Sequence, residues 1–146
     1  MNKSFIDFPL SFIVSLVWVS SYGYKYNVAF LNSPFVNWFS FTLWTAGLFS
    51  TIRIYRFFAE RISRQSVVII IMGLVYFVSL WIIEFVGYYM MKIRLTTSYD
   101  PLLFGVIHGP TVLKCYYVLA GPGIIFLIVC LDKVYEIYIR VKNRPV

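Results

Sequence analysis

The sequence predicts an all-α, polytopic membrane protein with four transmembrane helices and a long outer loop between the third and the fourth. Composition gives the first observation: 60% of the 146 residues are hydrophobic and 13% are charged, whereas soluble domains carry about 25% charged residues. The second observation is that the charges lie between long apolar stretches. The third is the uneven distribution of Lys and Arg over the two sides that four crossings would create.

Four intervals of the chain hold almost no charge. The interval 26–52 contains none, the interval 65–91 contains only Glu84, and the intervals 8–24 and 115–131 are charge-free and 17 residues long. A helix needs about 20 residues to cross a bilayer, with a range that includes 17. We therefore expect a single integral membrane domain over residues 1–146, with helices at about 7–22, 35–58, 66–91 and 110–131 and an interfacial C-terminal extension to about 142.

The first segment leaves two alternatives open. With Lys3, an apolar centre and small residues at Ser20 and Ser21, it has the features of a secretory signal, and a three-span arrangement would lay it in the membrane interface. Four spans place nine basic residues on the side of both termini and four on the opposite side. Because basic residues accumulate in cytoplasmic segments, we expect both termini in the cytoplasm and the connection 92–110 outside, where it could form a re-entrant segment.

Basic residues cluster between the second and third predicted helices. The net charge is +7, but Lys and Arg lie at the ends of apolar runs, which argues against a nucleic-acid partner and for an orienting role. We interpret the cluster as a cytoplasmic basic anchor; its alternative role is docking of anionic lipid or an acidic partner subunit. Its members are Arg53, Arg56, Arg61 and Arg64.

Glu84 is the one carboxylate within the third predicted span. It lies about seven residues before the outer end of that helix, ~10 Å below the boundary at 1.5 Å per residue. Lys114 lies ~6 Å below the same boundary in the fourth helix. Ionisable groups in spans are usually paired. We therefore expect Glu84 and Lys114 to form a pair that joins the third helix to the fourth.

The same outer end suggests a binding or catalytic site. A helix that starts near Pro110 presents free backbone N–H groups such as that of Thr111, and with His108 and Lys114 these form a candidate anion- or lipid-binding site. If the outer loop folds inward, Asp100, His108 and Glu84 could act as a catalytic set for proton transfer, hydration or isomerisation on a lipid or isoprenoid chain. The alternatives are a hydrogen-bonding loop residue for His108 and turn chemistry for Asp100.

The motif AGPG, Ala120 to Gly123, interrupts the fourth predicted helix. Pro122 cannot donate a hydrogen bond to the carbonyl of Val118, so we expect a kink that either serves packing or forms a cavity wall. The chain has one histidine and two cysteines and lacks CxxC, GxSxG and Gly-rich phosphate motifs. We therefore expect no metal site and no cofactor, and no motif assigns the chain to a family.

Two classes of function agree with these features. The first is an accessory or assembly subunit of a larger membrane complex, with the lipid bilayer, partner subunits or further copies of the chain as its partners. The second is an outer-leaflet lipid- or isoprenoid-modifying enzyme, or a lipid-binding module, that uses the cluster of Glu84, His108 and Lys114. The scarcity of polar residues in the spans favours the first class, and the sequence leaves open whether the protein is an enzyme.

Overall fold

A computed structural model describes residues 5–93, 103–107 and 110–142, and within these ranges it contains helices and no strand. Four helices are long: α1 (Asp7–Tyr22), α2 (Trp38–Ala59), α3 (Gln65–Phe85) and α5 (Thr111–Lys142). The all-α prediction is confirmed. The shorter elements are the 3-10 turn η2 (Ala29–Leu31), the π-helical turn η3 (Val86–Met90) that continues α3, and the single turn α4 (Leu103–Val106).

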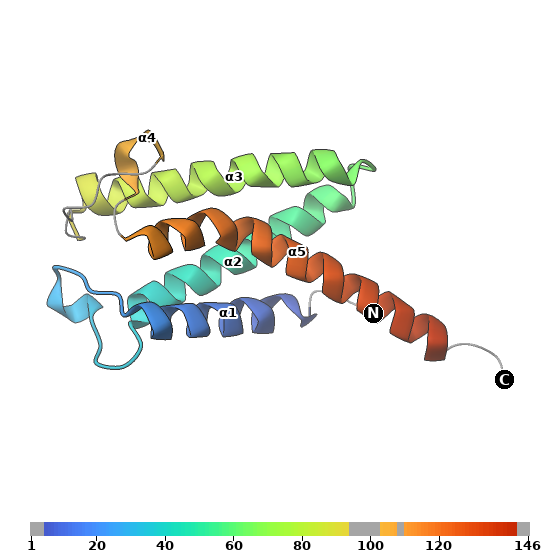
Figure 1. Ribbon diagram of the computed structural model, residues 1–146, viewed down its shortest axis with the longest axis horizontal. Coiled ribbons are helices and arrows are strands. Elements are labelled where there is room, and N and C mark those ends of the chain that lie inside the picture. Colours follow the sequence, from blue (N-terminus) through green and yellow to red (C-terminus); the bar gives the residue numbers. More distant parts are fainter. Residues whose placement is uncertain (1–4, 94–102, 108–109, 143–146) are drawn as a thin grey trace.

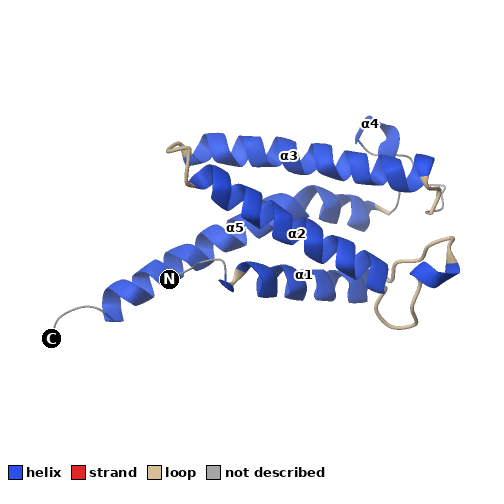
Figure 2. Ribbon diagram, turned by 180° about the vertical axis from the view of Figure 1, so that it is seen from behind, coloured by secondary structure: helices blue, strands red, loops and turns tan. Residues whose placement is uncertain are grey.

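The four long helices lie side by side and alternate in direction (Figure 1). Helices α2 and α5 each contact all three of the other long helices, and the most extensive contact is that of α1 with α2. The five residues 60–64 join α2 to α3, and this short connection makes the two helices antiparallel neighbours. Seen from behind, the second half of α5 extends past the ends of the other three helices (Figure 2). The predicted fourth helix and its extension are thus one continuous helix.

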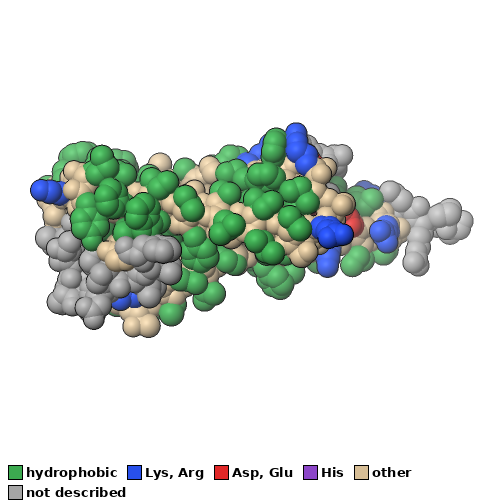
Figure 3. Space-filling model, turned by 90° about the horizontal axis from the view of Figure 1, so that it is seen from above, with side chains coloured by type: hydrophobic (Ala, Val, Ile, Leu, Met, Phe, Trp, Pro, Cys, Tyr) green, Lys and Arg blue, Asp and Glu red, His purple; other side chains and the backbone are tan. Residues whose placement is uncertain are grey.

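Two helices are long and apolar enough to cross a membrane. They are α3 with its π-helical turn, Gln65–Met90 at 26 residues, and α5 at 32 residues. Helix α1 is apolar but has only 16 residues, and α2 contains Arg53 and Arg56. Hydrophobic side chains cover much of the face shown in Figure 3. On all sides of the molecule, exposed hydrophobic residues of the long helices include Ile13, Val17, Ile70, Leu74, Val78, Ile82, Leu119 and Phe126.

Helix α1 buries a polar row against the bundle. Asp7, Ser11, Ser15 and Val19 follow one another at intervals of four residues and are all buried. The Ser11 hydroxyl donates a hydrogen bond to the backbone carbonyl of Asp7 at 2.8 Å. Small side chains let two helix backbones approach closely, which accounts for the extensive contact between α1 and α2.

The connection between α1 and α2 is held by its own polar side chains. Gly23, with φ of 68°, ends α1 in the left-handed conformation that glycine adopts readily. Asn32 accepts from the backbone N–H of Tyr26 and donates to its carbonyl, both at 2.8 Å. Asn37 accepts from the N–H of Ser40 at 2.9 Å and caps α2. This cap places the start of α2 at Trp38 rather than at the predicted residue 35.

Helices α3 and α5 meet at a tyrosine and a glycine. A Cβ atom on Gly121 would lie 2.4 Å from the Tyr76 ring, so only glycine admits this ring. The Tyr76 hydroxyl donates to the Tyr117 carbonyl at 2.6 Å. In a regular helix this carbonyl accepts from the backbone N–H of Gly121. Beside them stands Pro122, and the two halves of α5 run at an angle to one another (Figure 1).

Candidate functional site

A cavity of about 340 Å³ lies between α2 and α3 and reaches Tyr117 of α5. Its α2 wall includes Leu43, Trp44 and Leu48, and its α3 wall includes Leu80 among other apolar side chains. Gly47 also lines the cavity, and a Cβ atom built on it meets nothing within 4 Å. The cavity therefore has room for an apolar ligand.

The cavity opens between exposed apolar side chains. Leu43 and Ile54 of α2 and Ile83 of α3 line it, and all three are exposed large hydrophobic residues. They belong to the same apolar surface that covers the outside of the helices. A ligand would therefore reach the cavity through this apolar surface.

Glu84 supplies the acidic group of the cavity. It is 1% exposed and continues the buried row of α3, in which Val68, Met72, Tyr76, Leu80 and Glu84 recur every four residues. Among the described residues that line the cavity, Glu84 is the only Asp or Glu, and none is Lys, Arg or His. The helical repeat thus turns a carboxylate toward an otherwise uncharged cavity.

Aromatic rings and hydroxyl groups form the rest of the polar wall. Tyr26 lines the cavity from the loop after α1, and its hydroxyl lies 2.6 Å from the hydroxyl of Ser40. The rings of Trp44 and Tyr117 have centroids 5.3 Å apart, and Tyr76 lies beside them in the wall. The cavity therefore combines one carboxylate, several hydroxyl groups and four aromatic faces.

One hydroxyl outside the cavity fixes the position of the Trp44 ring. The indole N–H groups of Trp18 and Trp44 both donate to the Tyr24 hydroxyl, at 2.7 and 3.0 Å. Trp18 also stacks on Tyr116 of α5, with ring planes 7° apart. These contacts lie at the end where α1 finishes, and the ring of Trp44 is held by Tyr24 of the loop after α1 and by Tyr116 of α5.

The structure places some of the predicted site residues and leaves others outside the described ranges. Glu84 lines the cavity, whereas Lys114 is half-buried in the first turn of α5 and does not line it. Thr111 is the exposed first residue of α5. Asp100 and His108 lie outside the described residues. The catalytic set, the anion site and the pair of Glu84 with Lys114 therefore stay predictions.

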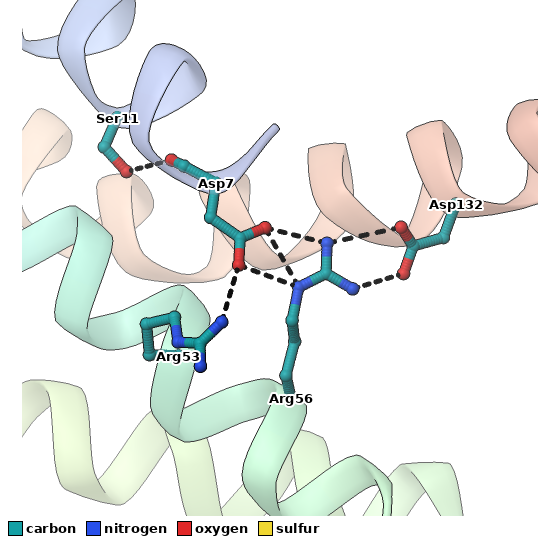
Figure 4. A network of polar contacts seen from close by, with 5 residues as sticks. All are labelled: Asp7, Ser11, Arg53, Arg56 and Asp132. Carbon is teal, nitrogen blue, oxygen red and sulfur yellow. Dashed lines mark hydrogen bonds and ion pairs between the residues drawn. The ribbon is translucent and has the colours of Figure 1, made fainter. Parts of the chain in front are cut away.

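A second polar cluster joins three helices at the opposite end of the bundle (Figure 4). The Nε of Arg56 donates to both carboxylate oxygens of Asp7, at 2.9 and 3.0 Å, and Nη2 donates to Oδ1 at 2.8 Å. The other edge of the guanidinium donates to Asp132 at 2.9 and 3.3 Å. Asp7 is 0% exposed, and the side chains of Arg56 and Asp132 are 13% and 22% exposed. Arg56 thus binds α1 and α5 to α2.

The predicted basic anchor divides into residues with different surroundings. Arg53 lies 3.6 Å from Asp7, but 49% of its side chain is exposed. Arg61 lies over the Phe57 ring, 3.6 Å from its centroid, and Arg64 is exposed before the first turn of α3. Only Arg56 is largely enclosed by carboxylates.

Asp7 and Asp132 were not among the sequence-predicted site residues. The sequence does contain a pattern that points to Asp7. Asp7, Ser11 and Ser15 are spaced four residues apart, and polar residues at this spacing lie on one face of a helix. Asp132 lies four residues after the buried Ile128 on α5. Its contact with Arg56 joins residues 76 positions apart, and no local pattern predicts such a contact.

Compared with protein-family models, with curated proteins and with solved structures, the chain matches none of them. Its function is therefore argued from the cavity and from the polar clusters alone.

Proposed function

We propose that this chain is a small four-span membrane protein, with both termini in the cytoplasm, that binds a lipid-like molecule in the cavity between α2 and α3. The observation that carries the proposal is a cavity of about 340 Å³ with an exposed apolar rim. Small-molecule sites usually measure about 300–1,000 Å³ and are mostly apolar. A ligand dissolved in the bilayer could enter without passing through water.

The Arg56 cluster supports the assignment of α2 as a span. Charged groups within spans are nearly always paired, and Arg56 is paired with Asp7 and Asp132. The 22 residues of α2 make a helix about 33 Å long, which matches the ~30 Å hydrocarbon core. Helix α1 packs along α2 and brings the buried Asp7 to the guanidinium. If all four long helices span the membrane, Arg56, Asp7 and Asp132 are still paired with one another.

Photo-crosslinking with a diazirine-bearing hexadecanol tests the proposal. The full chain is placed in phosphatidylcholine nanodiscs, labelled at increasing mole fractions of probe, and mapped by peptide mass spectrometry. A bound ligand labels the cavity segments of α2 and α3 in a saturable manner, whereas bulk lipid labels exposed helix faces in proportion to its concentration. Labelling that rises linearly at every position would contradict the proposal.

A matched pair of glycine variants sharpens this test. Gly47→Leu adds a side chain where the cavity wall is open, and we expect it to abolish saturable labelling. Gly73→Leu is the control, because Gly73 of α3 does not line the cavity and its Cβ would also meet nothing within 4 Å. Equal saturable labelling in both variants would show that the ligand does not occupy the cavity.

The accessory-subunit prediction rests on the apolar helix surfaces. Lipid acyl chains cover apolar helix surfaces as well as the helices of a partner subunit do. The exposed apolar surfaces therefore do not show whether lipid or a partner subunit covers them. The enzyme prediction depends on Asp100 and His108, which lie outside the described residues. Binding of a lipid-like molecule is the function that the described cavity supports directly.

A further inference from the structure

We infer that the ligand of this cavity is a single-chain lipid with a hydroxyl head group, bound with its head at the end of the cavity where Tyr26 and Ser40 lie. This inference rests on the proposed function and adds the class and the direction of the ligand to it. Two features carry it: the elongated shape of the cavity and the uneven distribution of hydroxyl groups along its wall.

The cavity is elongated along the helix axes. Its lining runs along α2 from Ser40 to Ile54, which is about 21 Å of helix at 1.5 Å per residue. Its volume of about 340 Å³ is at the lower end of the range for small-molecule sites. A long cavity of small volume suits one extended hydrocarbon chain rather than the two chains of a phospholipid.

Ser40 and Glu84 lie at the same end of the cavity. The connection 60–64 makes α2 and α3 antiparallel neighbours, so residues equally far from it along the two helices lie at about the same level. Ser40 precedes residue 60 by 20 positions, and Glu84 follows residue 64 by 20. The hydroxyl of Tyr26 joins them, because it lies 2.6 Å from the hydroxyl of Ser40. We call Tyr26 and Ser40 the hydroxyl pair.

The hydroxyl pair can bind an alcohol. Each hydroxyl group has one donor and two acceptor positions, so the buried Ser40 hydroxyl keeps a further position beside its contact with Tyr26. The rings of Trp44 and Tyr117, with centroids 5.3 Å apart, line the same half of the cavity. These groups make this end of the cavity polar whatever the Glu84 carboxylate is bonded to.

The opposite end of the cavity suits a hydrocarbon chain. Gly47 leaves room along α2, and Ile54 is the lining residue of α2 nearest to Arg56. The Thr51 hydroxyl donates to the Gly47 carbonyl at 2.9 Å, so its hydrogen is already used within the helix. The other hydroxyl group at this end belongs to Ser50, which is exposed. A head group moved to this end would lose its hydrogen bonds to the hydroxyl pair.

The direction of the ligand also indicates the leaflet from which it comes. Since we place both termini in the cytoplasm, the hydroxyl pair faces the outer leaflet and Ile54 faces the inner one. The exposed side chains of Leu43 and Ile83 form the apolar rim on the side of the hydroxyl pair. A lipid of the outer leaflet can therefore enter there without turning over.

Two isomers of diazirine-bearing hexadecanol test the direction. One carries the diazirine near the hydroxyl group and the other near the terminal methyl group. Each is titrated into phosphatidylcholine nanodiscs that contain the full chain, and the saturable part of the labelling is mapped by peptide mass spectrometry. We expect the first isomer to label residues 40–44 and 80–84 and the second to label residues 50–54. The reversed map, or one map for both isomers, would overturn the direction.

A probe without a head group tests the class of the ligand. Diazirine-bearing hexadecane has the same chain length as hexadecanol but lacks the hydroxyl group. In the parent protein, we expect hexadecane to need a mole fraction about fivefold higher for half-saturation, the difference that one neutral hydrogen bond provides. Equal half-saturation by the two probes would show that the cavity does not bind the hydroxyl head.

A double variant identifies the groups that bind the head. Ser40→Ala with Tyr26→Phe removes both hydroxyl groups of the pair, and we expect hexadecanol then to half-saturate no better than hexadecane. Thr42→Ala is the control, because the Thr42 hydroxyl is exposed, donates to the Trp38 carbonyl and lies outside the cavity. A preference for hexadecanol that persists in the double variant would overturn the role of the hydroxyl pair.

The outcomes separate this inference from the proposed function. Saturable labelling with a reversed or a common map, or without a preference for hexadecanol, overturns the inference and leaves lipid binding intact. Absence of saturable labelling by every probe overturns lipid binding itself. The isomers and the hexadecane probe are compared on the parent protein, so they decide the inference even where the double variant fails to fold.

Discussion

Replacing Arg56 by methionine should destabilise the bundle more than any other single loss of charge on α2. The variant leaves Asp7, which is 0% exposed, without the guanidinium that binds both of its oxygens. Removing one partner of a buried ion pair costs about 3–5 kcal/mol, because the remaining charge stays buried. Asp132 is 22% exposed and can regain water, so we assign most of this loss to Asp7.

The free energy of unfolding can be measured by titrating a denaturing detergent into mild-detergent micelles. Arg56→Lys keeps the charge but loses the planar fork that binds two carboxylates at once, so we expect an intermediate loss. In the double variant Asp7→Asn with Arg56→Met, the loss should be smaller than the sum of the single losses, since the two residues share one interaction.

Arg53→Met is the matched control for this experiment. Arg53 lies on the same helix and is 3.6 Å from the same carboxylate, but its side chain is 49% exposed. Exposed pairs contribute about 0–1 kcal/mol. Should Arg56→Met lose no more than Arg53→Met, the guanidinium would not be what holds Asp7 inside the bundle.

Three further predictions concern other parts of the chain. Gly121→Ala should destabilise the protein by about 1–3 kcal/mol in the same titration, because the added Cβ would overlap the Tyr76 ring. Gly123→Ala is its control. A Cβ on Gly123 meets nothing within 4 Å, so this variant should change the free energy of unfolding by less than about 1 kcal/mol. Asn37→Ala removes the side chain that caps α2 and should lower the free energy of unfolding by about 0.5–2 kcal/mol. In a cysteine-free background, an impermeant maleimide should label Lys25→Cys in intact cells, whereas it should label Arg64→Cys only after the cells are permeabilised. The reverse labelling would contradict the proposed placement of both termini in the cytoplasm.

The sequence predicts the helices because each depends on a local property. Intervals with almost no charge mark the long helices, and this pattern is visible in the sequence without knowledge of tertiary contacts. The start of α2 was predicted at about residue 35, whereas Asn37 caps the helix and its first residue is Trp38. The π-helical turn at Val86–Met90 was missed, because five residues are too few to show a change in the helical repeat.

The sites are less predictable because they depend on contacts between distant residues. Glu84 drew attention as a charge within an apolar run, but the cavity beside it forms only when α2 and α3 pack. Asp7 was predicted only as the start of a helix, whereas it is buried beside Arg56 of α2. The close approach at Gly121 was not expected either, because a glycine next to Pro122 predicts a bend without naming the ring that fills the space.

The order in which the chain is synthesised bears on the Arg56 cluster. Arg56 follows Asp7 by 49 residues, and Asp132 follows Arg56 by 76. Chains are made from the N-terminus, so α1 and α2 can pack against each other, with one ion pair formed, before α5 is made. The second carboxylate arrives only with the last long helix. A chain truncated before residue 132 would keep the contact of Arg56 with Asp7 but lack the one that joins α5 to α2.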